Sequence, residues 1–248
     1  MKRTSVLLLF ICVCFLQCTK NLDSSGIGNY AGEGGSLARF AISGNYLYTV
    51  DDQTLTVYDI TAPGNPVLKN RVSIGFSIET IYPFKENLFI GSSTVIYIYS
   101  IADPLNPKKL SEGISPEVIR RCDPVVAKDT VAFATLRTSG PCGGAQSSLV
   151  VFNIKDISHP IQKASINIPE PYGLGYSNDA LYVCDITGLY VFDISDPYRP
   201  VQVKLLKDAG SYIDVIAYQG VLICWVKEGI VLYDISNNKA PKLLARIL

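Results

Sequence analysis

One segment pattern recurs five times along this 248-residue chain and limits its fold more than any other feature. In each copy an aromatic residue, a short polar residue and an isoleucine follow one another, and a proline comes seven residues after the polar position. The aromatic residues are Tyr58, Tyr99, Phe152, Phe192 and Tyr233, and the prolines are Pro66, Pro107, Pro160, Pro200 and Pro241. Successive aromatic positions lie 41, 53, 40 and 41 residues apart. Self-similarity at this period indicates a repeat architecture.

Each repeat contains four runs of strand length. In the fourth copy they are YGLGYS, ALYVCD, GLYVFDI and PVQVKLL, separated by connections short enough for hairpins. No helical periodicity appears after the N-terminal segment. Four strands per ~40 residues predict an all-β, five-bladed β-propeller with four antiparallel strands per blade. We expect the propeller to span residues 36–248, with blades at about 36–75, 76–115, 116–168, 169–208 and 209–248.

The repeated polar residue and proline have a structural explanation. Asp193 ends the third strand of its blade, where a carboxylate can bond the amides of the next turn. Pro200 opens the fourth strand, because proline cannot donate to a sheet ladder and is tolerated at edges and strand starts. The sequence predicts a ring in which the first and last blades meet without exchanging a strand, or in which residues 29–35 add one.

The first 35 residues differ from the rest. Lys2 and Arg3 precede an apolar run, VLLLFICVCFL, which has the length of an export signal rather than a membrane span. The following FLQCTK resembles a bacterial lipoprotein lipobox, although Gln17 departs from the small residue usual there. The resemblance implies a signal peptide at 1–17, a lipid on Cys18 and a flexible, Gly-rich tether at 18–35. The alternative is an ordinary signal peptide cut slightly later.

The repeats resemble those of LVIVD-repeat proteins, which are exported bacterial β-propellers. LYVCDITGLYVFDISDPYRPV carries the resemblance most closely, and it extends with variation from Ser36 to Leu248. With the lipobox, it implies a lipid-anchored protein of the bacterial cell envelope, expected at the outer membrane on its periplasmic or surface side. The motif is informative about fold and weak about function.

The third repeat is the longest. Aligning Val131 with Leu47, Leu88, Leu181 and Leu222 places about ten extra residues, including Cys142, between its second and third strands. Cys122 comes just before its first strand, and in an antiparallel blade these two positions share one rim. A Cys122–Cys142 disulfide would close a loop of about twenty residues, contributing roughly 3 kcal/mol. RRCDPVV…TLR…CGG also resembles a segment of exported LVIVD-repeat proteins; the alternative is two free thiols.

The remaining cysteines and the histidine do not suggest a metal site. Cys184 aligns with Trp225, so Cys224 is one position off, and both cysteines are expected to be buried apolar residues. His159, the only histidine, lies in a Ser-His-Pro turn on the opposite rim from the insertion. We expect no metal and no cofactor.

The rim with the insertion is the predicted binding face, because loops on a rigid scaffold commonly carry function. Its candidate residues are Arg120, Arg121, Asp123, Arg137, Glu170, Tyr172, Asp185, Tyr212 and Asp214. For any one of them the alternative is a solvated surface charge in a local ion pair.

Charge and composition narrow the function. Twenty-two basic residues balance twenty-two acidic ones, so nothing predicts nucleic-acid binding. We favour a non-enzymatic binding or scaffold module that contacts the membrane through Cys18 and meets an envelope protein or glycan. A structural lipoprotein without ligand is the main alternative. A carbohydrate-active enzyme would need two funnel carboxylates about 5–9.5 Å apart, and no motif selects such a pair.

Overall fold

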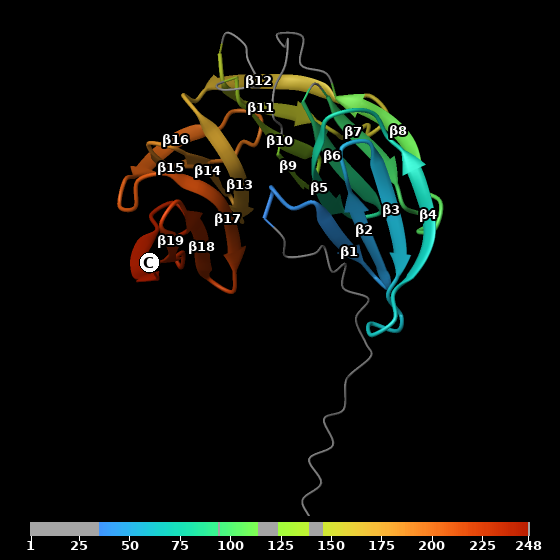
Figure 1. The fold of residues 1–248 in the computed structure, drawn as a ribbon. Coiled ribbons are helices and arrows are strands. Elements are labelled where there is room, and N and C mark those ends of the chain that lie inside the picture. Colours follow the sequence, from blue (N-terminus) through green and yellow to red (C-terminus); the bar gives the residue numbers. More distant parts are fainter. Residues whose placement is uncertain (1–34, 94, 114–123, 139–145, 248) are drawn as a thin grey trace, which may run out of the picture.

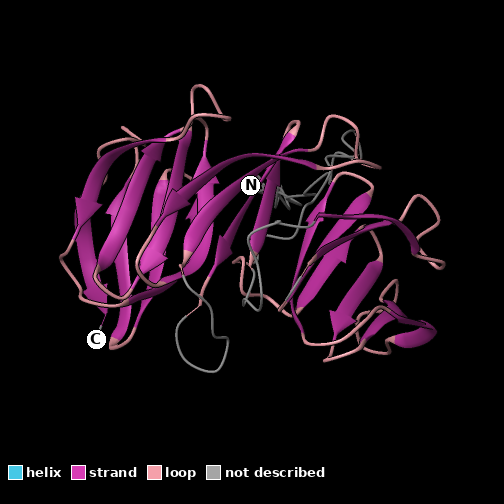
Figure 2. Ribbon diagram, turned by 90° about the horizontal axis from the view of Figure 1, so that it is seen from above, coloured by secondary structure: helices cyan, strands magenta, loops and turns pink. Residues whose placement is uncertain are grey.

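The computed structural model describes residues 35–93, 95–113, 124–138 and 146–247, and this part of the chain contains strands and loops without any helix (Figure 2). Twenty strands form five four-stranded antiparallel sheets, each in simple chain order. The predicted fold class, a five-bladed β-propeller with four strands per blade, is confirmed. The described residues therefore also offer no helical segment with the length and hydrophobicity of a membrane crossing.

Each blade is one sheet, and its four strands follow one another along the chain. Blade 1 contains β1 (Phe40–Ser43), β2 (Tyr46–Val50), β3 (Thr54–Asp59) and β4 (Val67–Ser73). Blade 2 contains β5 (Ile78–Phe84), β6 (Asn87–Ser92), β7 (Ile96–Ser100) and β8 (Lys108–Gly113). Blade 3 contains β9 (Val125–Lys128), β10 (Val131–Leu136), β11 (Ser148–Asn153) and β12 (Ile161–Asn167). Blade 4 contains β13 (Pro171–Ser177), β14 (Ala180–Asp185), β15 (Gly188–Asp193) and β16 (Val201–Leu206). Blade 5 contains β17 (Tyr212–Tyr218), β18 (Val221–Val226), β19 (Gly229–Asp234) and β20 (Lys242–Ile247).

The blades stand side by side around an axis, with the first strand of each innermost and the fourth outermost (Figure 1). Each consecutive pair of blades shares one buried apolar cluster, which gives four clusters for five blades. No such cluster joins blade 5 to blade 1 among the described residues, and Figure 1 shows an open arc between them. The sequence predicted two ways of closing the ring, and the second of them depends on residues 29–35, of which only Gly35 is described, so the mode of closure stays a prediction.

Face-to-face packing explains why the strand sequences are apolar without alternation. In β15, Leu189 and Val191 pack toward blade 5 while Tyr190 and Phe192 pack toward blade 3. Both faces of an internal blade are therefore covered, as in other buried sheets. We call the face of a blade toward the next blade along the chain its front face, and the opposite face its back face.

The predicted register of the third repeat is off by one residue. Leu47, Leu88, Leu181 and Leu222 each pair with the repeat aromatic of their blade, and the residue that pairs with Phe152 is Ala132 rather than Val131. Because successive side chains of a strand point to opposite faces of the sheet, a slip of one residue places each side chain of β10 on the face opposite to the predicted one. Ala132 packs toward blade 2, and Val131 packs toward blade 4.

The repeated turn follows the prediction in all five blades. The side-chain oxygen of the polar residue accepts a hydrogen bond from the amide two positions on, at distances such as 2.9 Å for Asp59–Thr61 and 2.8 Å for Asp193–Ser195. Each proline stands directly before the fourth strand of its blade. A register shift at the repeat aromatic also recurs in every third-to-fourth strand pair, so the motif encodes a β-bulge and the turn after it.

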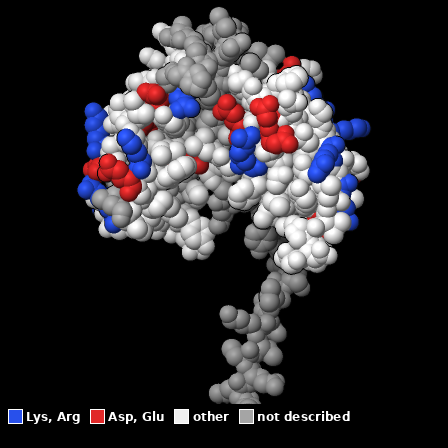
Figure 3. Space-filling view, viewed as in Figure 1, with Lys and Arg blue, Asp and Glu red and all other residues white. Residues whose placement is uncertain are grey.

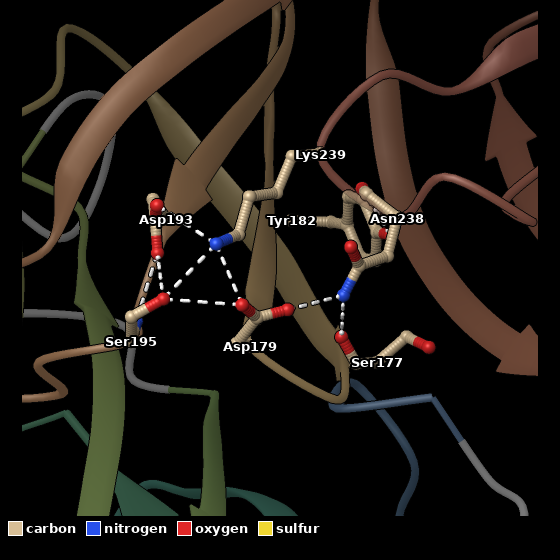
Figure 4. A network of polar contacts seen from close by, with 7 residues as sticks. All are labelled: Ser177, Asp179, Tyr182, Asp193, Ser195, Asn238 and Lys239. Carbon is tan, nitrogen blue, oxygen red and sulfur yellow. Dashed lines mark hydrogen bonds and ion pairs between the residues drawn. The ribbon is translucent and has the colours of Figure 1, made fainter.

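Polar contacts join blades 4 and 5 at the rim formed by the turns between strands one and two and between strands three and four (Figure 4). We call this end the turn rim. Lys239 of blade 5 lies 2.6 Å from Asp179 and 2.8 Å from Asp193, both of blade 4. Its hydrogen bond to Asp193 lowers the pKa of that carboxyl to about 2. Tyr182 crosses the same interface and donates to the Asn238 carbonyl at 2.7 Å.

Cys184 and Cys224 are free, buried thiols, as predicted. They lie on opposite faces of their own blades, but those faces meet, so both belong to the cluster between blades 4 and 5. Burial raises the pKa of both thiols, which keeps them protonated and unreactive.

Candidate functional site at the entry rim

The candidate site lies at the end of the propeller opposite the turn rim. Here each inner strand begins and the hairpin between strands two and three turns, and we call this end the entry rim. The 3.1 Å hydrogen bond from the Thr135 amide to the Pro124 carbonyl places the start of the inner strand of blade 3 beside the end of β10, where the insertion begins. Of the predicted residues, Cys18, Arg120, Arg121, Cys122, Asp123 and Cys142 lie outside the described residues. The lipid anchor and the disulfide therefore remain predictions.

Four side chains from four consecutive blades form the centre of this rim. We call Arg39, Glu79, Arg137 and Tyr172 the axial cluster. Arg39 of blade 1 donates through Nη2 to the Ile78 carbonyl of blade 2 at 2.9 Å. The Arg137 guanidinium lies over the Tyr172 ring, 4.2 Å from its centroid, which is a cation–π contact between blades 3 and 4. The cluster thus bridges blades 1 to 4.

Bulges at the start of the inner strands present two of these residues. The pairing of β5 with β6 skips Glu79, and the pairing of β13 with β14 skips Tyr172. Bulges are common near functional sites because they redirect a side chain away from the regular sheet positions. The bulges at the starts of β5 and β13 therefore position the Glu79 and Tyr172 side chains in the axial cluster.

Glu79 is the charged group whose environment is most unusual in this cluster. Partial burial raises the pKa of its carboxyl, and the positive charges of Arg137 and Arg39 oppose that rise. Among the described residues, no basic group lies within 4.0 Å of this carboxylate. Glu79 thus interacts electrostatically with both guanidinium groups, and no direct ion pair joins it to either of them.

Asp214 of β17 holds the segment that leads into blade 1. Its carboxylate accepts hydrogen bonds from the Val215 amide at 2.9 Å and from the Leu37 amide and the Ser36 hydroxyl at 3.2 Å each. The Ser36 oxygen in turn accepts from the Leu174 amide of β13 at 2.7 Å. Ser36 therefore links the N-terminal segment to blades 4 and 5, and Asp214 acts as a structural latch.

Burial raises the pKa of the Asp214 carboxyl above its usual value of 3.8, and the three donors only partly oppose this effect. The folded state therefore retains this proton at pH values where the unfolded chain has released it. Stability falls as the pH rises from the unfolded value through the raised one. Between pH 3.5 and 7, we expect wild type to lose stability relative to Asp214→Asn, which has no carboxyl group at this position to ionise. Urea denaturation of both proteins across this pH range measures the difference in unfolding free energy. A difference that does not change with pH would contradict this prediction.

Two other predicted residues also have structural roles. Asp185 is fully buried, and its carboxylate accepts from the Thr187 hydroxyl at 2.6 Å and from the Thr187 and Glu170 amides at 2.8 Å each. Tyr212 is buried and shares a 2.5 Å hydrogen bond with Tyr233, which donates to Asp208 at 3.2 Å. Within the described part of the rim, Asp185, Tyr212 and Asp214 therefore have structural roles, the Glu170 amide donates to Asp185, and Arg137 and Tyr172 contact each other.

Arg39 and Glu79 are not among the rim residues predicted from the sequence. The predicted residues were chosen near loops, whereas Glu79 lies inside the apolar strand IETIYPF. The one sequence signal that could have identified Glu79 is its position as a single acidic residue within an apolar strand. Arg39 offers no comparable signal, because its partner carbonyl belongs to the next blade.

Two open grooves lie at the turn rim. A groove of about 610 Å³ is lined by residues including Lys163, Tyr198 and Arg199, and a second of about 400 Å³ adjoins Lys155 and His159. His159 bonds Asp156 within its own turn at 3.0 Å, on the rim predicted for it. The described residues include no cluster of three or more His, Cys, Asp or Glu side chains able to hold a metal ion.

Comparisons with known proteins support the architecture. The LVIVD repeat model matches residues 34–73 and 177–205. A functionally unknown protein from Desulfotomaculum acetoxidans aligns with a TM-score of 0.68 at 8% identity, over 84% of this chain and 68% of that chain. A Lactobacillus plantarum protein gives a TM-score of 0.68 at 14% identity, over 82% and 67% of the two chains. The periplasmic gluconolactonase of Pseudomonas aeruginosa gives 0.64 at 14% identity, over the same shares.

These structural likenesses are too distant in sequence to show more than the fold. No curated protein matches the sequence. Together, the five sheets and the recurring turn motif show a five-bladed β-propeller, and residues 34–73 and 177–205 of it match the LVIVD repeat model.

Proposed function

We propose that this propeller is an exported, lipid-anchored, non-enzymatic binding or scaffold module of the bacterial cell envelope. The entry rim would be its recognition face, and an envelope protein or glycan would be its partner. The observation that carries the proposal is the axial cluster, in which Arg39 bonds the Ile78 carbonyl, Arg137 lies over Tyr172, and no direct ion pair joins Glu79 to either arginine.

The N-terminal sequence supports export and anchoring. Lys2 and Arg3, the apolar run and Cys18 after it have the order of a lipoprotein signal, and the polar segment after Cys18 suits a tether. One structural neighbour is described as periplasmic, which is compatible with an envelope location. Residues 19–39 would separate the lipid on Cys18 from β1, the first strand of blade 1.

The rim favours binding over catalysis. A glycosidase mechanism needs two carboxylates facing one space, one of them able to give or take a proton. Asp185 and Asp214 instead bond backbone amides and a hydroxyl that hold local structure. Arginine beside tyrosine is a combination enriched at protein interfaces, because both side chains contribute large contact areas and oriented donors.

The proposal is tested by affinity capture from a detergent-solubilised envelope of the source bacterium. The bait is the mature chain, compared with the double variant Arg39→Gln/Arg137→Gln, which removes both positive charges from the axial cluster. We expect the double variant to lose the proteins or glycans that wild type retains. Full-length protein with Cys18→Ser should leave the membrane fraction in the same cells.

A matched control removes two charges from the other rim. Lys155→Gln/Lys163→Gln changes exposed lysines beside the turn-rim grooves and should retain the wild-type partners. Equal thermal midpoints for all baits show that each is folded. Loss of partners by the control alone, or identical capture by all three baits, would refute the entry rim as the recognition face.

A further inference from the structure

The two ends of the blade series expose apolar surface that is buried everywhere else in the propeller. On blade 5, Trp225 is 52% exposed and Tyr218 is 39% exposed. On blade 1, Phe40 is 59% exposed and Ile42 is 39% exposed. Contiguous exposed apolar surface of this kind commonly marks an interaction site.

These residues belong to the faces that internal blades use for packing. Trp225 occupies the strand position that Cys184 holds in blade 4, where the side chain is fully buried against blade 5. Phe40 occupies the position of Val215, which is 2% exposed in the cluster between blades 4 and 5. The exposed surfaces are therefore the front face of the last blade and the back face of the first.

Every internal interface joins one front face to one back face. The four clusters all follow this rule, for example with Tyr48 and Val50 of blade 1 against Leu88 and Ile90 of blade 2. Blade 5 has an unpaired front face and blade 1 has an unpaired back face, which is the combination that pairs at every internal interface. Figure 3 nevertheless shows a notch between these two blades. Among the described residues, Ser36 and Leu37 donate to Asp214 of blade 5, and Ser36 also accepts from the Leu174 amide of blade 4.

We propose that a second copy of this chain covers these faces, with blade 1 of one copy stacked on blade 5 of the next. This contact continues the blade-to-blade packing that already occurs four times within the chain. The chain's own segment after Cys18, TKNLDSSGIGNYAGEG, is a poor occupant because it is polar and rich in glycine. The contact is heterologous, because it joins two different surfaces of identical chains.

A heterologous contact makes a distinctive prediction for mixtures of variants. The mature chain with Cys18→Ser is compared with versions carrying Phe40→Glu, which inactivates the blade 1 face, or Trp225→Glu, which inactivates the blade 5 face. Wild type should self-associate with rising concentration in sedimentation velocity, and each single variant should stay monomeric. An equimolar mixture of the two variants should form a one-to-one dimer and nothing larger, because each supplies one intact face.

Trp225 is the only tryptophan in the chain, so its fluorescence reports the contact directly. In the Phe40→Glu protein the emission should be that of an exposed indole and should be quenched by iodide. Addition of the tryptophan-free Trp225→Glu protein should shift the emission to shorter wavelength and protect it from iodide. Val203→Glu, at a 46% exposed position on the outer strand of blade 4, should associate as wild type does.

Three results would overturn the proposal. One is a wild-type monomer at all concentrations with an exposed Trp225, which would mean that another partner or none covers these faces. Another is a monomer in which Trp225 is protected, which would mean that the arc closes on itself. The last is association of either single variant alone, which would place the contact elsewhere.

Discussion

Replacement of Phe133 by alanine is expected to lower the free energy of unfolding by about 3–5 kcal/mol. Phe133 is fully buried on the front face of blade 3, in a cluster that includes Leu174, Leu181 and Val183 of blade 4. The substitution removes a ring from the contact between two blades, where the strands on both sides are held by their own ladders and cannot collapse into the space. Equilibrium unfolding in guanidinium chloride measures the loss.

Phe76→Ala provides the matched control for this change. Phe76 is 72% exposed in the connection between blades 1 and 2, so the same substitution there should change stability by about 0.5 kcal/mol or less. A small effect at Phe133 would contradict the view that face-to-face packing between blades supplies most of the stability. A cooperative transition with an unchanged slope would show that the blades unfold together.

The repeat motif made the fold predictable because each of its parts has a local physical cause. Asp193 bonds the amide of Ser195, the bulge lies at Phe192, and Pro200 precedes a strand whose first amide need not donate. These requirements involve neighbours in sequence, so they leave a pattern that repeats with the blade. Helices could be excluded because helical periodicity is also a local pattern, and the sequence after the N-terminal segment does not contain it.

Features that depend on contacts between blades were harder to predict. The register slip at Val131 arose because alignment by chemical similarity cannot distinguish the two faces of a strand whose faces are both apolar. Cys184 and Cys224 lie on opposite faces of their own blades, which suggested that they are far apart. The front face of blade 4 meets the back face of blade 5, however, so the two cysteines share one cluster. The open side of the arc depends on the angle between blades, which the repeat does not encode.

The candidate site was predicted only in part for a related reason. Arg137 and Tyr172 were selected as rim residues and are in contact, but Asp185 and Asp214 were selected by charge and proved to bond backbone amides. Whether a carboxylate binds a ligand or a buried amide depends on donors that come from distant segments, such as Leu37 for Asp214. Glu79 was missed because only the bulge in β5 separates it from the regular strand positions.

Gly173→Ala is expected to lower the free energy of unfolding by about 1–3 kcal/mol. A Cβ atom at this position would lie 2.1 Å from the Asp214 carboxylate and 2.9 Å from the Ile213 carbonyl, so both the latch and the backbone of β17 would have to move. Displacement of Asp214 would also weaken its hydrogen bonds to Ser36 and Leu37, which hold the segment before blade 1. The expected loss therefore includes both steric strain and partly unsatisfied buried groups.

Two companion variants separate these causes. Gly64→Ala lies in an open turn with no atom within 4 Å of the added methyl group, so it should leave stability within about 0.5 kcal/mol of wild type. Asp214→Ala removes the carboxylate that the new methyl group would strike, and Gly173→Ala should cost less in that background, because the two residues are in contact. If the cost of Gly173→Ala is the same in both backgrounds, the Asp214 carboxylate moves aside without cost, and the destabilisation comes from the contact with the β17 backbone alone. If the cost is absent in both, blades 4 and 5 are not packed closely enough at their inner strands for Asp214 to hold the N-terminal segment in place.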